Sequence, residues 1–185
     1  MDKILATLMF FTRLPFWRIK QVDTEHFKHV VTYWPLAGWL TGGIMVGVLW
    51  LTSQVMPLSM AWLLAIVSRL LVTGCLHEDG LADFCDGMGG GVTRERILLI
   101  MKDSHIGTYG VIGLIIYFLL LTQLSALPLS LLCAIVFTGD VWCKFVSSHI
   151  INILPYARKE EEAKNKTIYH SMTAIEAFIG ALLGT

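Results

Sequence analysis

Residues 29–68 read HVVTYWPLAGWLTGGIMVGVLWLTSQVMPLSMAWLLAIVS, which is 40 consecutive residues without Asp, Glu, Lys or Arg. A second run of 36 residues without these charges extends from Ser104 to Gly139. A helix needs about 20 apolar residues to span a bilayer, so each run is long enough for two spans. One proline lies near the middle of each run, Pro57 in the first and Pro128 in the second. Because proline removes a backbone donor and disfavours helix just before it, each run is expected to fold as a helical hairpin.

The chain is therefore predicted to be an all-α polytopic membrane protein, a bundle of helical hairpins with a polar site on its cytoplasmic side. The predicted spans cover residues 34–56, 58–76, 109–127 and 129–154, with a partial fifth span over 172–185. We expect the whole chain to form one integral membrane domain that is truncated at its C-terminus. A water-soluble bundle is the alternative, but its helices would need a polar face that the charge-free runs do not provide.

The composition excludes other classes of protein. Hydrophobic residues make up 55% of the 185 residues and charged residues only 15%, whereas globular domains carry about 25% charged residues. The 14 basic and 14 acidic residues balance, so no overall basic field indicates nucleic-acid binding. The four cysteines contain no C-x-x-C pair, and we expect neither a disulfide nor a zinc site.

The basic residues predict the orientation in the membrane. Twelve of the 14 Lys and Arg residues lie on one side of the predicted spans, and neither hairpin tip carries one. The twelve are Lys3, Arg13, Arg18, Lys20, Lys28, Arg94, Arg96, Lys102, Arg158, Lys159, Lys164 and Lys166. The positive-inside rule then places the N-terminus and both larger loops in the cytoplasm. The short apolar stretch Ile4–Phe11 is predicted to be an interfacial amphipathic helix rather than a signal peptide.

The chemistry is concentrated in the first large loop, where residues 77–87 read HEDGLADFCDG. Asp79, Asp83 and Asp86 are spaced i, i+4, i+7, which places them on one face of a helix. Three carboxylates on one semi-apolar stripe repel one another, and a divalent cation would offset that repulsion. Because an all-oxygen ligand set favours Mg²⁺ or Mn²⁺, we predict a metal site here. A solvated acidic face without a ligand is the alternative.

Basic side chains follow in the same loop, where Thr93 is expected to cap a helix that carries Arg94 and Arg96, and Lys102 comes after it. Arg and Lys near metal-binding carboxylates suit a metal-bridged phosphate or diphosphate. Contact with lipid headgroups is the alternative for the two arginines.

Arg69, Asp140 and Lys144 are the Asp, Glu, Lys and Arg residues inside the four complete predicted spans, where charges are costly and are usually paired or functional. Asp140 and Lys144 are four residues apart on one helix face, so they either neutralise each other or Lys144 contacts a substrate phosphate. Arg69 has no oppositely charged neighbour at helical spacing within its span, and the aspartate cluster further along the chain is its candidate partner.

A family resemblance rests on these residues. The run His77–Gly87, with Arg96, residues 101–103 and Gly107, closely resembles the cobalamin synthase family, the adenosylcobinamide-GDP ribazoletransferases. That family shows H-x-D-G-L-A-D-x-x-D-G followed by R-x-x-x-x-M-[KR]-D-x-x-x-G. Its N-terminal F-[LI]-T-R-L-P is similar to Phe11–Pro15, and further landmarks resemble residues 35–38 and 156–158. Glu78 departs from an often apolar position, Lys144 falls about where the family often has Arg, and a C-terminal G-D-x-x-G-A motif is absent.

The resemblance implies an Mg²⁺-dependent enzyme of the bacterial inner membrane. Such enzymes join adenosylcobinamide-GDP to α-ribazole or its 5′-phosphate, form adenosylcobalamin or its phosphate, and release GMP. On this hypothesis the three aspartates hold Mg²⁺. Asp103 is the candidate for a fourth ligand or the catalytic base, and His77 is the other candidate base. The candidate phosphate-binding residues are Arg94, Arg96, Lys102 and Lys144. The expected partners are these substrates and the lipid bilayer, and the oligomeric state is left open.

The sequence also bears on two alternative functions. A CDP-alcohol phosphotransferase continues its D-G-x-x-A motif with Arg, but Asp83 stands at that position. A cation transporter subunit would need polar groups along a path through the membrane, and of Arg69, Asp140 and Lys144 two are basic.

Overall fold

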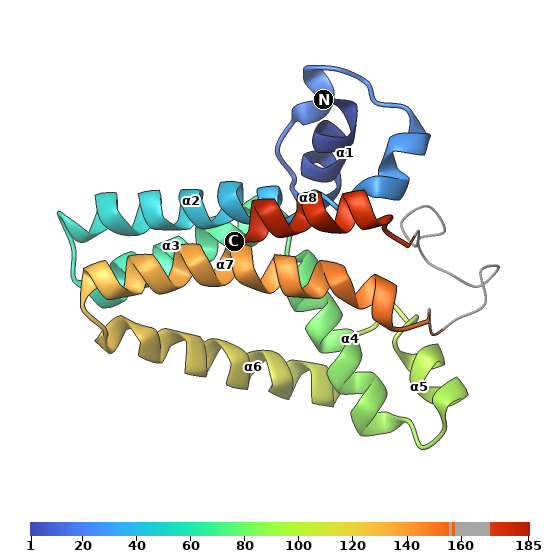
Figure 1. The fold of residues 1–185 in the computed structure, drawn as a ribbon. Coiled ribbons are helices and arrows are strands. Elements are labelled where there is room, and N and C mark those ends of the chain that lie inside the picture. The colour runs from blue at the N-terminus through green and yellow to red at the C-terminus, as the bar shows by residue number, and fades with distance from the viewer. Residues whose placement is uncertain (156, 158–170) are drawn as a thin grey trace. The chain divides into compact units, whose positions relative to one another are not determined.

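The computed structural model describes residues 1–155, 157 and 171–185, and every regular element within them is a helix. This confirms the all-α prediction. Figure 1 shows the helices in chain order. They are α1 (Asp2–Phe11), η1 (Phe16–Arg18), η2 (Thr24–His29), α2 (Trp34–Ser53), α3 (Leu58–Thr73), α4 (Leu76–Gly90), α5 (Arg94–Ile100), α6 (Thr108–Thr122), η3 (Gln123–Ala126), α7 (Leu129–Ile153) and α8 (Ala174–Gly184).

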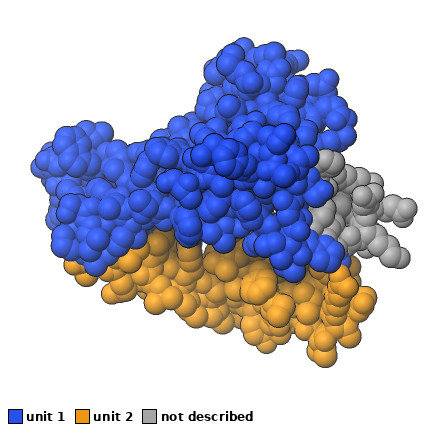
Figure 2. All heavy atoms as spheres, in the orientation of Figure 1, with its two compact units in different colours: residues 1–74, 127–185 blue, residues 75–126 orange. Residues whose placement is uncertain are grey.

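The chain divides into two compact units, which Figure 2 distinguishes by colour. Unit 1 comprises Met1–Gly74 and Leu127–Thr185, and unit 2 comprises Cys75–Ala126. Unit 2 therefore holds α4, α5 and α6, and with them most of the residues that the sequence predicts for the site.

Three helical segments are long and apolar enough to cross a membrane: α2, α6 continued by η3, and α7. A fourth is counted if α3 and α4 form one broken span. The prediction of a polytopic helical membrane protein is confirmed at this level. Pro57 and Pro128 directly precede α3 and α7, as expected for residues that break the helix before them.

The second predicted span ends earlier than expected, because α3 stops at Thr73 rather than continuing to residue 76. Gly74 and Cys75 both adopt left-handed backbone, with φ of 64° and 59°. Glycine populates this region freely, whereas Cys75 does so at a steric cost. A Cβ on Gly74 would also overlap the side chain of Arg13. The hydropathy pattern predicts the apolar span but carries no signal for this turn.

Within unit 1, α2 packs along α7 and α3, so the first predicted hairpin is formed. Small residues allow the close approach of α2 and α7. A Cβ at Gly38 would lie 2.9 Å from the Cα of Val141, and one at Gly42 would lie 3.4 Å from the Cβ of Asp140. Close backbone packing at small residues is typical of helices within membranes.

We predict that Gly38→Ala lowers the free energy of unfolding by about 1–3 kcal/mol, because the added methyl group meets backbone atoms of α7 that cannot move aside cheaply. Gly43→Ala is the matched control, since nothing lies within 4 Å of a Cβ built there. Thermal unfolding in detergent should separate the two variants. Equal midpoints would show that α2 and α7 leave room for a methyl group at Gly38.

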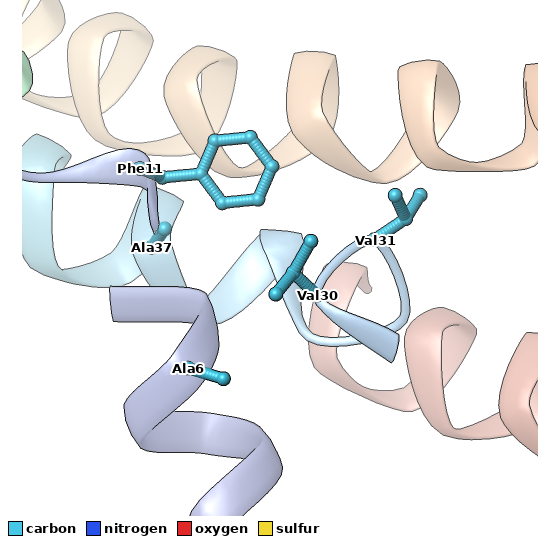
Figure 3. Close-up of a cluster of buried hydrophobic side chains, with 5 residues drawn as sticks. All are labelled: Ala6, Phe11, Val30, Val31 and Ala37. Atoms are coloured by element: carbon cyan, nitrogen blue, oxygen red, sulfur yellow. The ribbon is translucent and has the colours of Figure 1, made fainter. Parts of the chain in front are cut away.

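The N-terminal segment is anchored on unit 1 by a cluster of buried apolar side chains, Ala6, Phe11, Val30, Val31 and Ala37 (Figure 3). The ring of Phe11 also stacks on that of Trp34, with centroids 4.7 Å apart. The predicted helix at residues 4–11 is therefore present within α1. Its buried face packs on the chain itself, and its placement at the membrane interface stays a prediction.

Polar contacts join the same segment to α8. Glu176 forms a capping box with Thr173 at the start of α8. One oxygen of its carboxylate lies 2.6 Å from Nδ1 of His29 and 3.4 Å from Nζ of Lys3. These contacts join residues near both ends of the described chain within unit 1.

Candidate active site

The acidic motif lies on α4, as its i, i+4, i+7 spacing predicts. The three aspartates differ in their surroundings. Asp79 is exposed and Asp83 is partly buried, whereas Asp86 is only 8% exposed. A shared helix face therefore does not give the three carboxylates equal access to a ligand, and the difference arises from the packing of α6 on α4.

The carboxylate of Asp86 binds the N-terminus of α6. The backbone N–H of Gly107 donates to Oδ2 of Asp86 at 2.7 Å, and that of Gly110 donates to Oδ1 at 2.8 Å. The first N–H groups of a helix lack partners within the helix, and the N-terminus carries partial positive charge. Gly107 has no side chain to cap α6, so a carboxylate from α4 takes that role.

Small residues let α4 and α6 approach each other closely. A Cβ at Gly110 would lie 2.5 Å from Oδ2 of Asp86 and 3.0 Å from the carbonyl oxygen of Ala82. A Cβ at Gly113 would lie 2.5 Å from Sγ of Cys85. The sequence holds the signal for this contact, since glycines recur at positions 107, 110 and 113.

A hollow of about 610 Å³ lies over α5 and the loop that follows it. Its lining residues are Arg96, Leu99, Ile100, Lys102, Asp103, His105, Ile106 and Gly107. The structure thus brings together three residues that the sequence predicts separately, Arg96, Lys102 and Asp103. Thr93 caps α5 as predicted, by accepting a hydrogen bond from the N–H of Arg96 at 3.3 Å.

His105 is a residue of this hollow that the sequence reasoning missed. Its Nδ1 lies 2.6 Å from Oδ1 of Asp103, and its backbone N–H donates to the same oxygen at 3.0 Å. The available signal was the spacing Asp103-Ser104-His105, in which a carboxylate reaches the backbone two residues on. Both side chains are exposed, so the pair is open to a ligand from solvent.

Two other predicted residues are not part of this hollow. Both ring nitrogens of His77 are enclosed near the start of α4, and Arg94 is exposed at the first position of α5. Neither lines the hollow that contains Arg96 and Lys102.

The sequence of the whole chain was compared with known proteins. A family described as cobalamin-5-phosphate synthase matches residues 3–185. The chain belongs to this family. Among curated relatives, a protein of Leptothrix cholodnii is 39% identical over 182 residues, which cover 96% of this chain and 68% of that protein. A relative from Shewanella frigidimarina is 37% identical and covers 97% of this chain and 70% of its own length.

A third relative, from Shewanella woodyi, is 37% identical over 174 residues, which cover 92% of this chain and 68% of that protein. All three are named adenosylcobinamide-GDP ribazoletransferase. No solved structure matches this chain. The sequence-based recognition of the family is confirmed, and neither a CDP-alcohol phosphotransferase nor a cation transporter is supported.

In this cobalamin-5-phosphate synthase family member, the described residues contain no group of three or more His, Cys, Asp or Glu side chains placed to hold a metal ion. Both carboxylate oxygens of Asp86 accept backbone hydrogen bonds from the start of α6. The prediction that the three aspartates hold one or two Mg²⁺ ions therefore has no preformed cluster in support, and it stays a prediction.

Lys144 lies in unit 1, on α7, and is 4% exposed. Its Nζ donates to Oδ1 of Asp140 at 2.6 Å, which is the pairing that their spacing predicts. The hydroxyl of Thr41 donates to the other oxygen of Asp140. Nε of Arg69 lies 3.6 Å from Oδ1 of Asp140, so Arg69 has a carboxylate neighbour on α7 within unit 1. Its predicted pairing with the aspartate cluster of α4 stays a prediction.

The four basic residues after the fourth predicted span, Arg158, Lys159, Lys164 and Lys166, lie outside the described residues, as does the landmark Tyr156. Their part in the predicted orientation stays untested.

Proposed function

We propose that this chain catalyses the transfer named for its relatives, joining adenosylcobinamide-GDP to α-ribazole or its 5′-phosphate with release of GMP. The observation that carries the proposal is the hollow of unit 2, where two cationic side chains and a carboxylate–imidazole pair line one surface. Both substrate and leaving group carry phosphates, and Arg and Lys are the side chains that bind phosphates best.

In the proposed reaction, a ribose hydroxyl oxygen attacks the phosphorus attached to cobinamide. The bond between that phosphorus and the bridging oxygen breaks, and GMP leaves with that oxygen. Arg96 and Lys102 donate hydrogen bonds to the phosphate oxygens and offset their charge. Proposed roles for Arg94 and Lys144 in phosphate binding rest on sequence alone, and Lys144 already has Asp140 as its ion-pair partner.

The attacking hydroxyl must also lose its proton. Asp103 and His105 are the proposed acceptors, because they share a short hydrogen bond within the hollow and both side chains are exposed. When the Asp103 carboxylate accepts a hydrogen bond from Nδ1–H of His105, Nε2 of that ring has a free lone pair. Nε2 can then take the proton of the attacking hydroxyl. His77 is a weaker candidate, since both of its ring nitrogens are enclosed.

Magnesium is proposed as the cofactor, with Asp79 and Asp83 of α4 as its ligands. These side chains fit the ion, since Mg²⁺ prefers oxygen ligands and usually takes one or two carboxylates, several waters and substrate phosphates. They are one helical turn apart, and neither is buried as Asp86 is. When bound, Mg²⁺ would offset the charge of the diphosphate and of the departing GMP.

We further propose that the protein lies in the bacterial inner membrane with its N-terminus in the cytoplasm, because twelve basic residues fall on one side of the predicted spans. In intact cells, an impermeant thiol reagent should leave Arg94→Cys unmodified and should modify Val55→Cys, in a background without the four native cysteines. Both positions are exposed in the structure. The opposite labelling pattern would reverse the orientation.

Growth of a bacterium tests the function in the cell. In a strain that lacks its own ribazoletransferase and needs cobalamin, the full-length protein should restore growth on cobinamide. Asp79→Asn should not restore growth at equal expression, because a proposed metal ligand is lost. If the intact, inserted protein gave no growth although corrinoid uptake and activation were normal, the proposed function would be wrong.

A further inference from the structure

We propose that Asp86 is a positioning residue rather than a metal ligand: together with Gly87, it fixes both ends of the loop Met101–Gly107 that lines the phosphate-binding hollow. The inference rests on the proposed function for the role of the hollow. Its geometric part, that Asp86 holds the loop, stands on contacts within unit 2 alone.

The end of the loop is held by the carboxylate. Asp86 accepts hydrogen bonds from Gly107 and Gly110 at 2.7 and 2.8 Å, one on each oxygen. Hydrogen bonds from N–H groups to an ionised carboxylate are stronger than those to neutral acceptors. Gly107 is itself part of the lining of the hollow. The position of that wall is therefore set directly by Asp86.

The start of the loop is held by the next residue of α4. A Cβ at Gly87 would lie 2.6 Å from Cγ of Met101, so the Met101 side chain packs directly on the backbone of α4 at this position. Two consecutive residues of α4 therefore contact residues 101 and 107, and these residues bracket Lys102, Asp103 and His105.

Asp86 is more deeply buried than Asp79 and Asp83. It is 8% exposed, and a Cβ at Gly107 or Gly110 would lie 2.5 Å from one of its oxygens. Glycine at these two positions leaves room for the carboxylate against the α6 backbone. Because these backbone atoms are so close, little space is left beside Asp86 for a hydrated Mg²⁺. Asp79 has that space, because its side chain is exposed.

Catalysis depends on how accurately the loop positions Lys102, Asp103 and His105 in the hollow. A displacement of about 1 Å in groups that contact a substrate can cost about 100-fold in rate. If Asp86 is replaced by Asn, its amide NH₂ group faces one of the two N–H donors and cannot accept from it. One of the two hydrogen bonds that hold the Gly107 end of the loop is then lost, which loosens that end, although Asp79 and Asp83 remain in place.

The test compares Asp86→Asn and Gly110→Ala with Asp79→Asn, using two measurements that do not depend on turnover. Mn²⁺ binding, followed by the electron paramagnetic resonance of free Mn²⁺, reports the metal site. Trypsin cleavage after Lys102, located by mass spectrometry, reports release of the loop. Gly110→Ala disturbs the same contact without changing any charge, and Gly43→Ala is the control for the Gly-to-Ala change, because it meets nothing within 4 Å.

We expect Asp86→Asn and Gly110→Ala to keep Mn²⁺ affinity within twofold of the unmodified protein, with cleavage after Lys102 at least tenfold faster. GMP release should fall at least tenfold, and the double variant should be no worse than the poorer single variant. Asp79→Asn should show the converse, with weaker Mn²⁺ binding and unchanged cleavage.

Weaker Mn²⁺ binding in Asp86→Asn with unchanged cleavage would make Asp86 a metal ligand and overturn the proposal. Faster cleavage with normal GMP release would make the contact merely structural and would overturn it too. If Asp86→Asn fails to fold, Gly110→Ala decides between these outcomes. If the unmodified protein releases no GMP, the proposed function fails, and the metal and cleavage measurements still decide whether Asp86 holds the loop.

Discussion

Asp79→Asn should lower Mg²⁺-dependent GMP release by about 100-fold or more while the protein still folds and inserts into the membrane. A lost metal ligand typically removes several kcal/mol of transition-state stabilisation, and each ~1.4 kcal/mol is a factor of ten in rate. Folding should survive because Asp79 is exposed on α4, and the change removes a negative charge from an acidic helix. The measurement is turnover against Mg²⁺ concentration at matched protein levels.

Asp83→Asn should lower GMP release as much as Asp79→Asn does. The loss of rate in the double variant should be far smaller than the sum of the two single losses in free energy, because ligands of one ion act as a unit. Glu25→Gln is the control, since it removes an exposed carboxylate from η2 in unit 1. Near-normal turnover of Asp79→Asn at limiting Mg²⁺ would instead support a solvated acidic face without a metal.

Asp140→Asn should destabilise unit 1 by about 3–5 kcal/mol, because removing one partner of a buried ion pair leaves the other charge uncompensated. Lys144 is 4% exposed and donates to Asp140 at 2.6 Å, and the hydroxyl of Thr41 donates to the same carboxylate. The free energy of unfolding in mild detergent, measured with a denaturant or by heating, should reveal the loss.

The matched test is the double variant Asp140→Asn with Lys144→Met, which removes both charges of the pair. It should recover part of the stability lost in Asp140→Asn, giving a coupling energy of about 1–3 kcal/mol in a double-mutant cycle. Purely additive losses would show that the pair contributes nothing beyond its separate side chains.

The membrane helices were predictable because their signal is local. Long charge-free runs interrupted by Pro57 and Pro128 define α2, α3, α6 and α7 to within a few residues. The error at the end of α3 has a local cause that hydropathy does not report, the left-handed backbone of Gly74 and Cys75. The Asp140–Lys144 pair was also predictable, since residues four apart on a helix are neighbours.

The candidate site was predicted only in part, because its remaining contacts link residues that are distant in the sequence. Spacing on one helix places Asp79, Asp83 and Asp86 on a common face, but it cannot tell which of them a later helix will cover. Asp86 and Gly107 are 21 positions apart in the sequence, so helical periodicity does not predict their contact. Likewise, the approach of Arg69 on α3 to Asp140 on α7 depends on how helices pack within unit 1.

The most direct test of the proposed transferase activity is the nucleotide released by the purified full-length protein. With adenosylcobinamide-GDP, α-ribazole 5′-phosphate and Mg²⁺, chromatography should show GMP and a joined corrinoid product in equal amounts. Neither should form when Mg²⁺ is chelated or the ribazole is left out. Release of CMP from a CDP-alcohol, or the absence of GMP from a folded protein supplied with both substrates and Mg²⁺, would contradict the account.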